Sequence, residues 1–192
     1  MTTLLLTPAD APPTEVTLSD AELEKLLHYS SAEFVNGQVL EKRMGFESEG
    51  IVSELHIALG AFVRANQLGR VFGPATPYRC FPNDPRQVRK PDVSFVAAGR
   101  LPAGRLPRGS APFAPDLAVE VVSPTDPCEY LELKVADYRS AGVRLIWVVY
   151  PMTRSVLIRR LDRTCAELDE AGTLDGEDVV PGFACPVAAL FV

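Results

Sequence analysis

Residues 117–122, LAVEVV, form a run that is apolar on both alternating faces except at Glu120. Such a run is typical of a strand that other layers of the fold cover on both sides. An ionised carboxylate is costly in such a strand, and without a partner it normally takes up a proton. The run therefore predicts that a cation lies beside Glu120, or that the strand is less buried than its apolar residues indicate.

The segment after this run has the pattern of a helix, and a second buried strand follows it. Asp126 is expected to cap the helix, with Pro127 at its first position and Glu129 completing a capping box. Gly142 marks its end, and VRLIWVVYP is again a continuous apolar run. Four residues at helical spacing form the expected apolar stripe: Cys128, Leu131, Val135 and Tyr138.

Further helices and strands are expected on both sides of this segment. Ser19 and Glu22 form a capping box for a helix at about residues 20–29, and Asn36-Gly37 is a strong hairpin signal. Apolar spacing predicts a longer helix from about Glu47 to Gln67. Strands are expected at RVFG, PYRCF and PDVSFVA, and later at SVLIRRL and CAELDE, before the tail VVPGFACPVAALFV.

This order of elements predicts one mixed α/β or α+β domain around a central sheet. The segment 99–115 carries Gly, Pro and Arg without periodicity and is expected to be a loop. Residues 1–18 are expected to form a flexible leader, because the stretch 7–15 is rich in Pro and Ala, and residues 19–192 form the domain. The N-terminus lacks a basic region and a long apolar run, so we do not expect a signal peptide.

Composition excludes several classes of protein and of site. The 192 residues are 47% hydrophobic and 23% charged, as in an ordinary globular domain, and no stretch approaches ~18 consecutive apolar residues. The four cysteines form no CxxC pair, which argues against a zinc ribbon and is typical of reduced thiols in a cytoplasmic protein. With only His28 and His56 present, hydrolytic chemistry would have to rest on carboxylates and lysines.

The net charge of −6 does not indicate nucleic-acid binding, but its distribution is uneven. Between Arg79 and Arg108 there are seven basic and two acidic residues, a local balance of +5. This segment is either a solvated loop surface or a rim that faces phosphate groups.

Three charged residues stand out because each interrupts an apolar pattern: Asp92, Glu120 and Lys134. Taken singly, each has a plain explanation. Asp92 would be the first residue of a strand, Glu120 a carboxylate bonded to amides or to an arginine, and Lys134 a lysine extended along a helix. Lys134, however, shares a helix face with apolar residues three before and four after it. Together, two carboxylates suit Mg²⁺ or Mn²⁺, and a lysine beside them suits phosphodiester hydrolysis.

Pro91-Asp92, Glu120 and a following lysine resemble the signature of the PD-(D/E)XK nuclease superfamily. More narrowly, the chain resembles its Uma-two branch, a group described as putative restriction endonucleases. The stretches that carry this resemblance cover most of residues 30–185: EFVNGQVLE, RKPDVSFV, APDLAVEVVSPTD, KVADYRSAGVRLIWVVYP and VVPGF. The resemblance implies a restriction-endonuclease-like αβββαβ core that holds Mg²⁺ or Mn²⁺ and acts on DNA.

By this resemblance Asp92, Glu120 and the Val121 carbonyl would bind the metal, and Lys134 would assist the attacking water. The superfamily's lysine normally follows the glutamate by two residues, where this chain has Val122, so Lys134 would supply the ammonium group from the helix. The superfamily often adds an acidic residue from its first core helix. Here Glu47, Glu49 and Glu54 are available, and we favour Glu49; many relatives have a histidine near this point, where this chain has Ser48 or Glu49.

Three functions follow from these observations. The first is a metal-dependent endonuclease, and the alternative is a catalytically weak or inactive nuclease-fold module that binds nucleic acid. A structural interaction domain is the third, and it requires Asp92, Glu120 and Lys134 to lie far apart. The apolar strands and the C-terminal meander would also suit a homodimer, which could cut both strands of a duplex.

Overall fold

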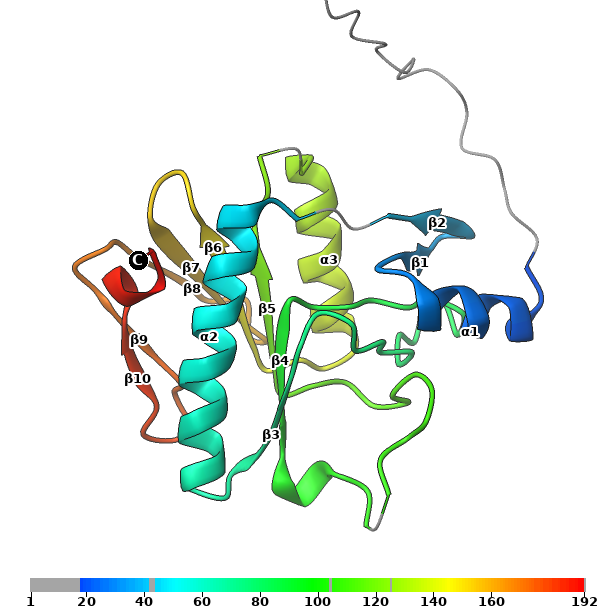
Figure 1. Cartoon of the computed structure of the whole chain (residues 1–192), viewed down its shortest axis with the longest axis horizontal. Coiled ribbons are helices and arrows are strands. Elements are labelled where there is room, and N and C mark those ends of the chain that lie inside the picture. Colours follow the sequence, from blue (N-terminus) through cyan, green and yellow to red (C-terminus); the bar gives the residue numbers. More distant parts are fainter. Residues whose placement is uncertain (1–17, 42–43, 104, 125, 192) are drawn as a thin grey trace, which may run out of the picture.

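The structure, a computed structural model, describes residues 18–41, 44–103, 105–124 and 126–191 (Figure 1). The leader predicted for residues 1–18 lies, up to residue 17, outside the described residues. In chain order the elements are α1 (Asp20–Tyr29), β1 (Glu33–Val35), β2 (Gln38–Leu40), α2 (Phe46–Ala65), β3 (Gly69–Phe72), β4 (Val93–Ala97), η1 (Ala98–Arg100), β5 (Leu117–Val121), α3 (Cys128–Ser140), β6 (Leu145–Tyr150), β7 (Ser155–Arg160), β8 (Cys165–Leu168), β9 (Thr173–Asp175), β10 (Ala184–Pro186) and η2 (Val187–Phe191), where η marks a 3₁₀ helix.

A six-stranded mixed sheet with the strand order β3-β4-β5-β6-β7-β8 forms the centre of the fold. Strands β5 and β6 are parallel, and the other neighbouring pairs are antiparallel. The crossover between the parallel strands is α3, so β5, α3 and β6 form a βαβ unit. The predicted mixed fold around one sheet is confirmed.

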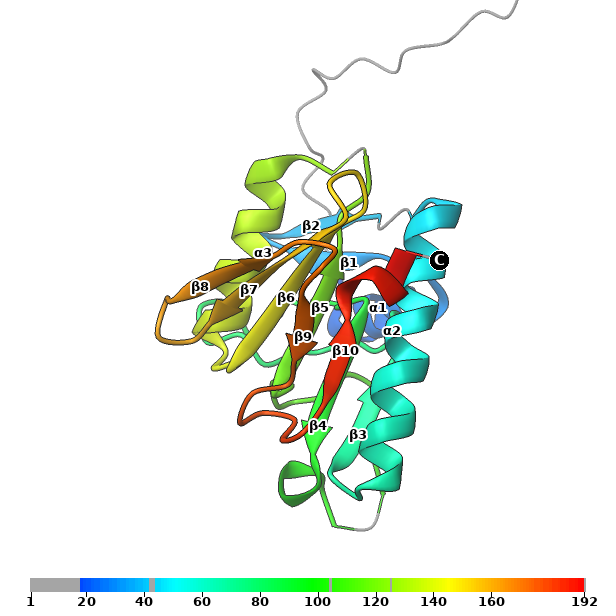
Figure 2. The ribbon, with the colours of Figure 1, turned by 90° about the vertical axis from the view of Figure 1, so that its left-hand side faces the viewer.

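Helices cover both faces of the sheet, α2 on one and α3 on the other (Figure 2). The apolar residues of β5 divide between these two layers, because successive side chains of a strand point to opposite faces. Leu117, Val119 and Val121 pack in the core beneath α2, whereas Ala118 packs beneath α3. This alternation turns Glu120 toward α3.

The N-terminal helix and hairpin form a separate layer beside the sheet (Figure 1). The predicted capping box is present, since the Ser19 side chain accepts from the backbone N–H of Glu22 and the Glu22 carboxylate accepts from that of Ser19. The hairpin turns at Asn36 and Gly37, both with positive φ, as a tight two-residue turn requires. The apolar side chains of Leu23 and Leu27 in α1 and of Phe34 in β1 pack together with the loop residue Val88.

Three local predictions are wrong. Asp126 does not cap α3; Pro127 holds the N-cap position, and the Asp126 carboxylate instead accepts from the backbone N–H of Ser123 (2.8 Å). Cys128 is exposed, because the apolar stripe begins one turn later at Leu131. The stretch PYRCF forms only isolated bridges at its tyrosine and no strand.

Among the residues that the structure describes, no helix combines the length and apolar character needed to cross a membrane.

Candidate active site

Asp92, the residue just before β4, lies opposite Glu120 of the neighbouring antiparallel strand β5. The register pairs Val93 with Val119, so its extension by one residue places Asp92 beside Glu120. The Asp92 backbone N–H donates to the Val119 carbonyl (2.9 Å), and the Val121 N–H donates to Asp92 Oδ2 (2.7 Å). Both carboxylates are buried. The sheet register therefore brings the two predicted metal ligands together.

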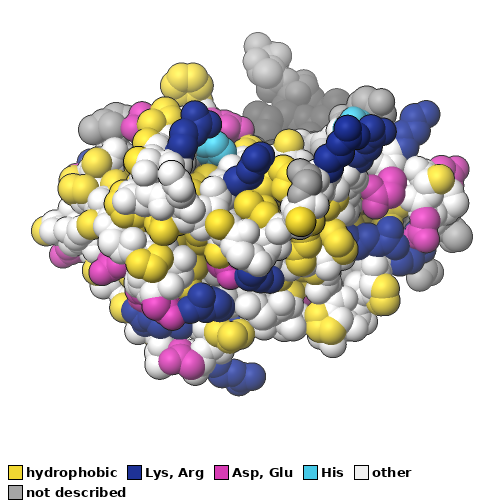
Figure 3. All heavy atoms as spheres, turned by 90° about the horizontal axis from the view of Figure 1, so that it is seen from below, with side chains coloured by type: hydrophobic (Ala, Val, Ile, Leu, Met, Phe, Trp, Pro, Cys, Tyr) yellow, Lys and Arg dark blue, Asp and Glu magenta, His cyan; other side chains and the backbone are white. Residues whose placement is uncertain are grey.

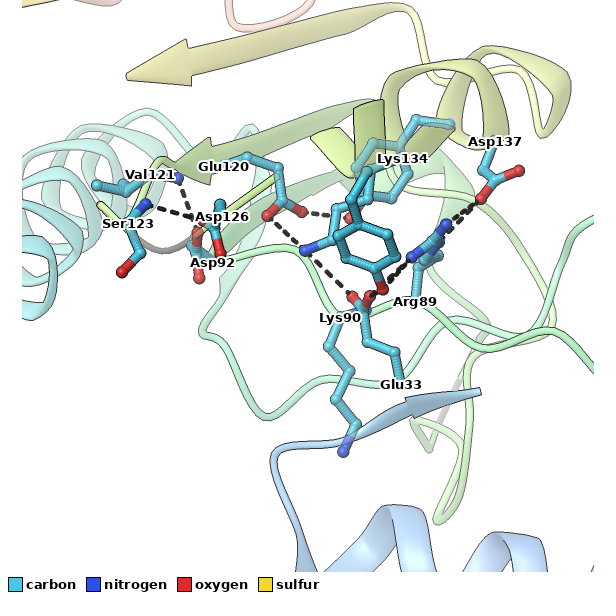
Figure 4. A network of polar contacts seen from close by, with 12 residues as sticks. Glu33, Arg89, Lys90, Asp92, Glu120, Val121, Ser123, Asp126, Lys134 and Asp137 are labelled. Atoms are coloured by element: carbon cyan, nitrogen blue, oxygen red, sulfur yellow. Dashed lines mark hydrogen bonds and ion pairs between the residues drawn. The ribbon is translucent and has the colours of Figure 1, made fainter. Parts of the chain in front are cut away.

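Lys134 reaches Glu120 from the helix that covers this face. Its Nζ donates to Glu120 Oε2 (3.0 Å), and the Tyr138 hydroxyl donates to Glu120 Oε1 (2.5 Å) (Figure 4). Lys134 and Tyr138 lie four residues apart, so they occupy the same face of α3. A cation thus lies beside Glu120, as the apolar run predicted, and it is the ammonium group of Lys134. This contact and the register that places Asp92 beside Glu120 contradict the wide separation of the three residues that a structural interaction domain required.

The surroundings of Lys134 keep it charged. Burial alone would lower its pKa, but the carboxylates of Glu120, Glu33 and Asp92, together with the hydrogen bond to Glu120, outweigh burial and raise it above the usual lysine range. The ammonium group is therefore a donor and a positive charge at neutral pH. It is not a base that could take a proton from water.

Glu33, the first residue of β1, is a third buried carboxylate beside Lys134. Its Oε1 lies 3.7 Å from Lys134 Nζ and accepts from the backbone N–H of Lys90 (2.8 Å). Its Oε2 accepts from Arg89 (2.9 Å) and from the Tyr130 hydroxyl (3.0 Å). Glu33 thus joins the hairpin to α3 and to the segment before β4.

Arg89 extends this network to the far end of α3. Its guanidinium group donates to Asp137 Oδ2 through two nitrogens (2.9 and 2.6 Å) and also to the Tyr130 hydroxyl (2.7 Å). Burial opposes the charge of Arg89, but Glu33, Tyr130 and Asp137 raise its pKa further above the usual range. The two tyrosines beside the carboxylates remain protonated, since burial raises the pKa of both Tyr130 and Tyr138.

Of the two alternatives for the segment from Arg79 to Arg108, a solvated loop surface or a phosphate-facing rim, the rim is largely absent from the described residues. Arg89 and Lys90 are buried, and the Lys90 ammonium group donates to the carbonyls of Leu27 (2.6 Å) and Ser30 (2.8 Å). Three of the other arginines pair with carboxylates: Arg79 and Arg86 with Asp20, and Arg100 with Asp116. Of the seven basic residues in this segment, only Arg105 and Arg108 are exposed without a carboxylate partner among the described residues.

A small cavity of about 40 Å³ opens beside these groups. Its lining comes from β1, the end of β2 and the residues after it, β5, the turn before α3, and α3: Glu33, Leu40, Glu41, Met44, Glu120, Val121, Asp126, Tyr130 and Lys134. A cavity of this volume has room for a few water-sized groups. Glu120 and Lys134 are therefore buried and yet border a space that a small ligand could enter.

The acidic residues predicted from the first core helix do not line this cavity. Glu47, Glu49 and Glu54 are all exposed on α2, which packs against the opposite face of the sheet. Glu54 lies beside Cys185 of β10. Burial raises the pKa of the Cys185 thiol, and the negative charge of Glu54 raises it further. Met44, just before α2, does line the cavity, so the N-terminal end of this helix is near the site. A role for Glu49 stays a prediction.

The donor types at the site fit a hard divalent cation. Carboxylate oxygens from Asp92 and Glu120 and the backbone carbonyl of Val121 are the oxygen ligands that Mg²⁺ and Mn²⁺ prefer. Within the described residues, no group of three or more His, Cys, Asp or Glu side chains is arranged to hold a metal. One ion would therefore need the backbone carbonyl and water in addition to the two carboxylates.

Sequence reasoning missed Glu33, Arg89, Tyr130, Tyr138 and Asp137. Arg89 and Lys90 directly precede Pro91-Asp92, which was the available signal, but we counted them as surface charges. Glu33 is the first residue of a three-residue strand, where a polar residue is ordinary. Only the tertiary structure shows that all of these side chains belong to one connected network.

Comparison with known structures identifies the class of fold. The chain is similar to the crystal structure of "a putative nuclease belonging to DUF820" from Anabaena variabilis, with a TM-score of 0.71 and 20% sequence identity. The match covers 83% of this chain and 89% of that one. The protein thus shares the fold of that structure, with a mixed sheet between helical layers.

Comparison with protein families then identifies the family. The sequence model of the Uma2 family, described as "Putative restriction endonuclease", matches residues 20–188, so the chain belongs to that family. The resemblance inferred from the sequence is confirmed. No curated protein matches the chain. Family and fold together support a restriction-type nuclease.

Proposed function

We propose that the protein is an endonuclease that hydrolyses DNA phosphodiester bonds with the help of Mg²⁺ or Mn²⁺. The observation that carries this proposal is the contact between Glu120 and Lys134 (3.0 Å), beside Asp92 on the neighbouring strand. Carboxylates that can hold a divalent cation and a fixed ammonium group are the parts that phosphodiester hydrolysis requires. Membership of the family supports the same reaction class.

In this mechanism Asp92, Glu120 and the Val121 carbonyl would hold the cation, which would act as a Lewis acid on the phosphoryl group. Hydrolysis adds the oxygen of water to phosphorus and breaks one ester P–O bond. One proton of the water is transferred, in net terms, to the leaving oxygen, so the products are a phosphate monoester and an alcohol. Lys134 stabilises the negative charge that grows on the phosphoryl oxygens. Its raised pKa keeps it charged throughout, so it acts as a cation and hydrogen-bond donor.

The remaining groups orient these residues. Tyr138 holds one oxygen of Glu120, and the Val121 N–H holds one oxygen of Asp92. Both carboxylates are buried, so little solvent surrounds them. In such surroundings electrostatic interactions are stronger than in water.

A second candidate function is a nuclease-fold module that binds nucleic acid with little or no turnover. The observation that favours it is that both oxygens of Glu120 accept hydrogen bonds from side chains. A cation that binds there competes with the Lys134 ammonium group. If the lysine holds Glu120 too strongly, the site binds no metal and does not turn over.

A cleavage assay tests the leading proposal. Purified protein is incubated with supercoiled and with single-stranded DNA in Mg²⁺, in Mn²⁺ and in EDTA. We expect cleavage only with metal, and at least a ~100-fold loss in Asp92→Asn and Glu120→Ala, as for removal of a main electrostatic group. Glu167→Gln, an exposed carboxylate change on β8, serves as the matched control and should cut normally. Equal cutting by parent and Glu120→Ala protein would refute the assignment.

Calorimetric titration with Mn²⁺ separates the two candidates. A nuclease should bind the ion and lose this binding in Asp92→Asn. A module whose site has decayed should bind nucleic acid but no metal. The titration needs no turnover, so its result is informative even if the preferred DNA substrate is missing from the assay.

A further inference from the structure

A groove runs between the C-terminal half of α2 and the edge strand β3, away from the candidate active site. Its volume is about 1210 Å³, and its charged or titratable lining residues are His56, Arg64 and Arg70. Ile57, Val71 and Phe72 contribute apolar surface. The described lining contains no acidic residue, although the whole chain carries a net charge of −6. The groove is thus a cationic region on an acidic protein.

The two arginines of this groove differ from most others in the molecule. Eight arginines elsewhere in the described chain form ion pairs with Asp or Glu: Arg79, Arg86, Arg89, Arg100, Arg144, Arg154, Arg159 and Arg160. Arg64 and Arg70 are exposed, and neither has a carboxylate partner among the residues that the structure describes. Their charge is therefore available to an external anion.

The strand beside these arginines is an edge of the sheet. Strand β3 pairs only with β4, so its outer side borders the groove rather than another strand of the described sheet. Figure 3 looks onto this end of the molecule, where Lys and Arg side chains stand among apolar ones. The groove therefore offers backbone polar groups, arginines and apolar patches. This combination suits a polymer ligand that carries regularly spaced anions and apolar rings.

The groove is separate from the candidate active site but lies along the same helix. Residues just before α2 line the active-site cavity, and Arg64 is near the other end of this helix. A rise of about 1.5 Å per residue places Arg64 roughly 27 Å from Phe46. One nucleic acid could span this length with roughly eight nucleotides of a strand, at about 3.4 Å each.

We propose that this groove binds the phosphate backbone of a nucleic acid through Arg64 and Arg70, at a distance from the cleavage site. The choice of a nucleic acid rests on the proposed function, and the charge of the groove supports it independently. A second copy of the chain fits less well, because symmetric pairing of two β3 edges would bring the Arg70 side chains of both copies close together. The contact is sequence-independent, since phosphate contacts carry no direct base information.

The test measures binding to a fluorescent duplex of about 20 bp in EDTA, so that cleavage cannot contribute. The parent is compared with Arg64→Ala/Arg70→Ala and with Arg64→Lys/Arg70→Lys, which keeps both charges. The matched control is Lys25→Ala/Arg163→Asn, which removes two exposed charges from α1 and from the β7–β8 turn at the opposite edge of the sheet. Asparagine is chosen because Arg163 has a φ of 72°.

For two lost phosphate contacts, the slope of log affinity against log salt should become shallower by about 1.8 in the alanine variant. When salt is raised from 50 to 200 mM, the affinity of both proteins falls. The factor by which it falls should be about twelvefold smaller for the alanine variant than for the parent. The lysine variant and the control should keep the parent slope. The inference is overturned if the parent does not bind DNA or if the alanine variant keeps the parent slope. It is also overturned if the alanine substitutions alter only self-association of the protein or only its binding of an acidic peptide. Cleavage, assayed separately, decides the proposed function.

Discussion

At the scale of single residues, the site is a set of buried charges that compensate one another. Lys134 lies between carboxylates from two strands and the hairpin, and each of these charges would be costly alone. Glu120 and Lys134 could be found in the sequence because each interrupts an apolar pattern. Glu33 could not, because a polar residue is unremarkable at the start of a hairpin strand, and its burial at 1% exposure depends on distant segments.

Replacement of Glu33 by Gln should destabilise the fold by about 3–5 kcal/mol, because Arg89 would lose part of its buried compensation. The matched control is Glu24→Gln, which removes a partly exposed partner of Arg79 and should cost about 0–1 kcal/mol. Urea unfolding of the three proteins measures both effects. Equal stability of Glu33→Gln and the parent would show that the network contributes little to folding.

The pH dependence of thiol reactivity tests the burial of Cys80. Burial raises the pKa of this thiol to about 11, although the nearby Arg100 partly opposes the shift. Because the thiolate is the reactive form, alkylation of Cys80 should still rise about tenfold per pH unit between pH 7 and 9.5. Mass spectrometry after iodoacetamide pulses measures this rate, with exposed Cys165 as the internal reference. A rate for Cys80 that levels off near pH 8.5 would contradict the half-buried position of this thiol.

At the scale of elements, the βαβ unit from β5 to β6 positions the site, and local patterns predicted most of it. Apolar runs located both strands, and helical spacing together with Gly142 located the end of α3. The start of α3 was misplaced, because an Asp before Pro can either cap a helix or close the turn that precedes it. The structure shows the turn, with Asp126 bonded to Ser123. Such local alternatives are close in energy, so neighbouring packing decides between them.

Two glycines should respond to alanine in opposite directions. Gly50 is an exposed residue inside α2, and an added Cβ would meet nothing within 4 Å, so Gly50→Ala should stabilise the protein by about 0.5–1 kcal/mol. Gly69 has a φ of 155°, and an added Cβ would lie 2.1 Å from the Val96 carbonyl oxygen, so Gly69→Ala should destabilise it. Thermal unfolding measures both, and stabilisation by Gly69→Ala would contradict the described pairing of β3 with β4.

At the scale of the whole molecule, the fold brings together residues that are distant in the sequence. Glu33, Asp92, Glu120 and Lys134 converge because the hairpin, two antiparallel strands and the crossover helix meet at one end of the sheet (Figure 4). The sequence predicted three of these four residues. It did not predict the surface, since the basic residues between Arg79 and Arg108, considered as a solvated surface or a phosphate-facing rim, are mostly buried or paired. The groove beside β3 instead offers arginines that have no carboxylate partner among the described residues.

The central claim is that Asp92 and Glu120 hold one divalent cation beside Lys134. Crystals soaked in Mn²⁺ and measured at an energy where manganese scatters anomalously test this directly. The account predicts one anomalous peak within about 2.0–2.6 Å of oxygens from both carboxylates, with Lys134 Nζ still nearby. It is contradicted by a map in which manganese binds elsewhere, or nowhere, while Glu120 keeps its hydrogen bonds to both Lys134 and Tyr138.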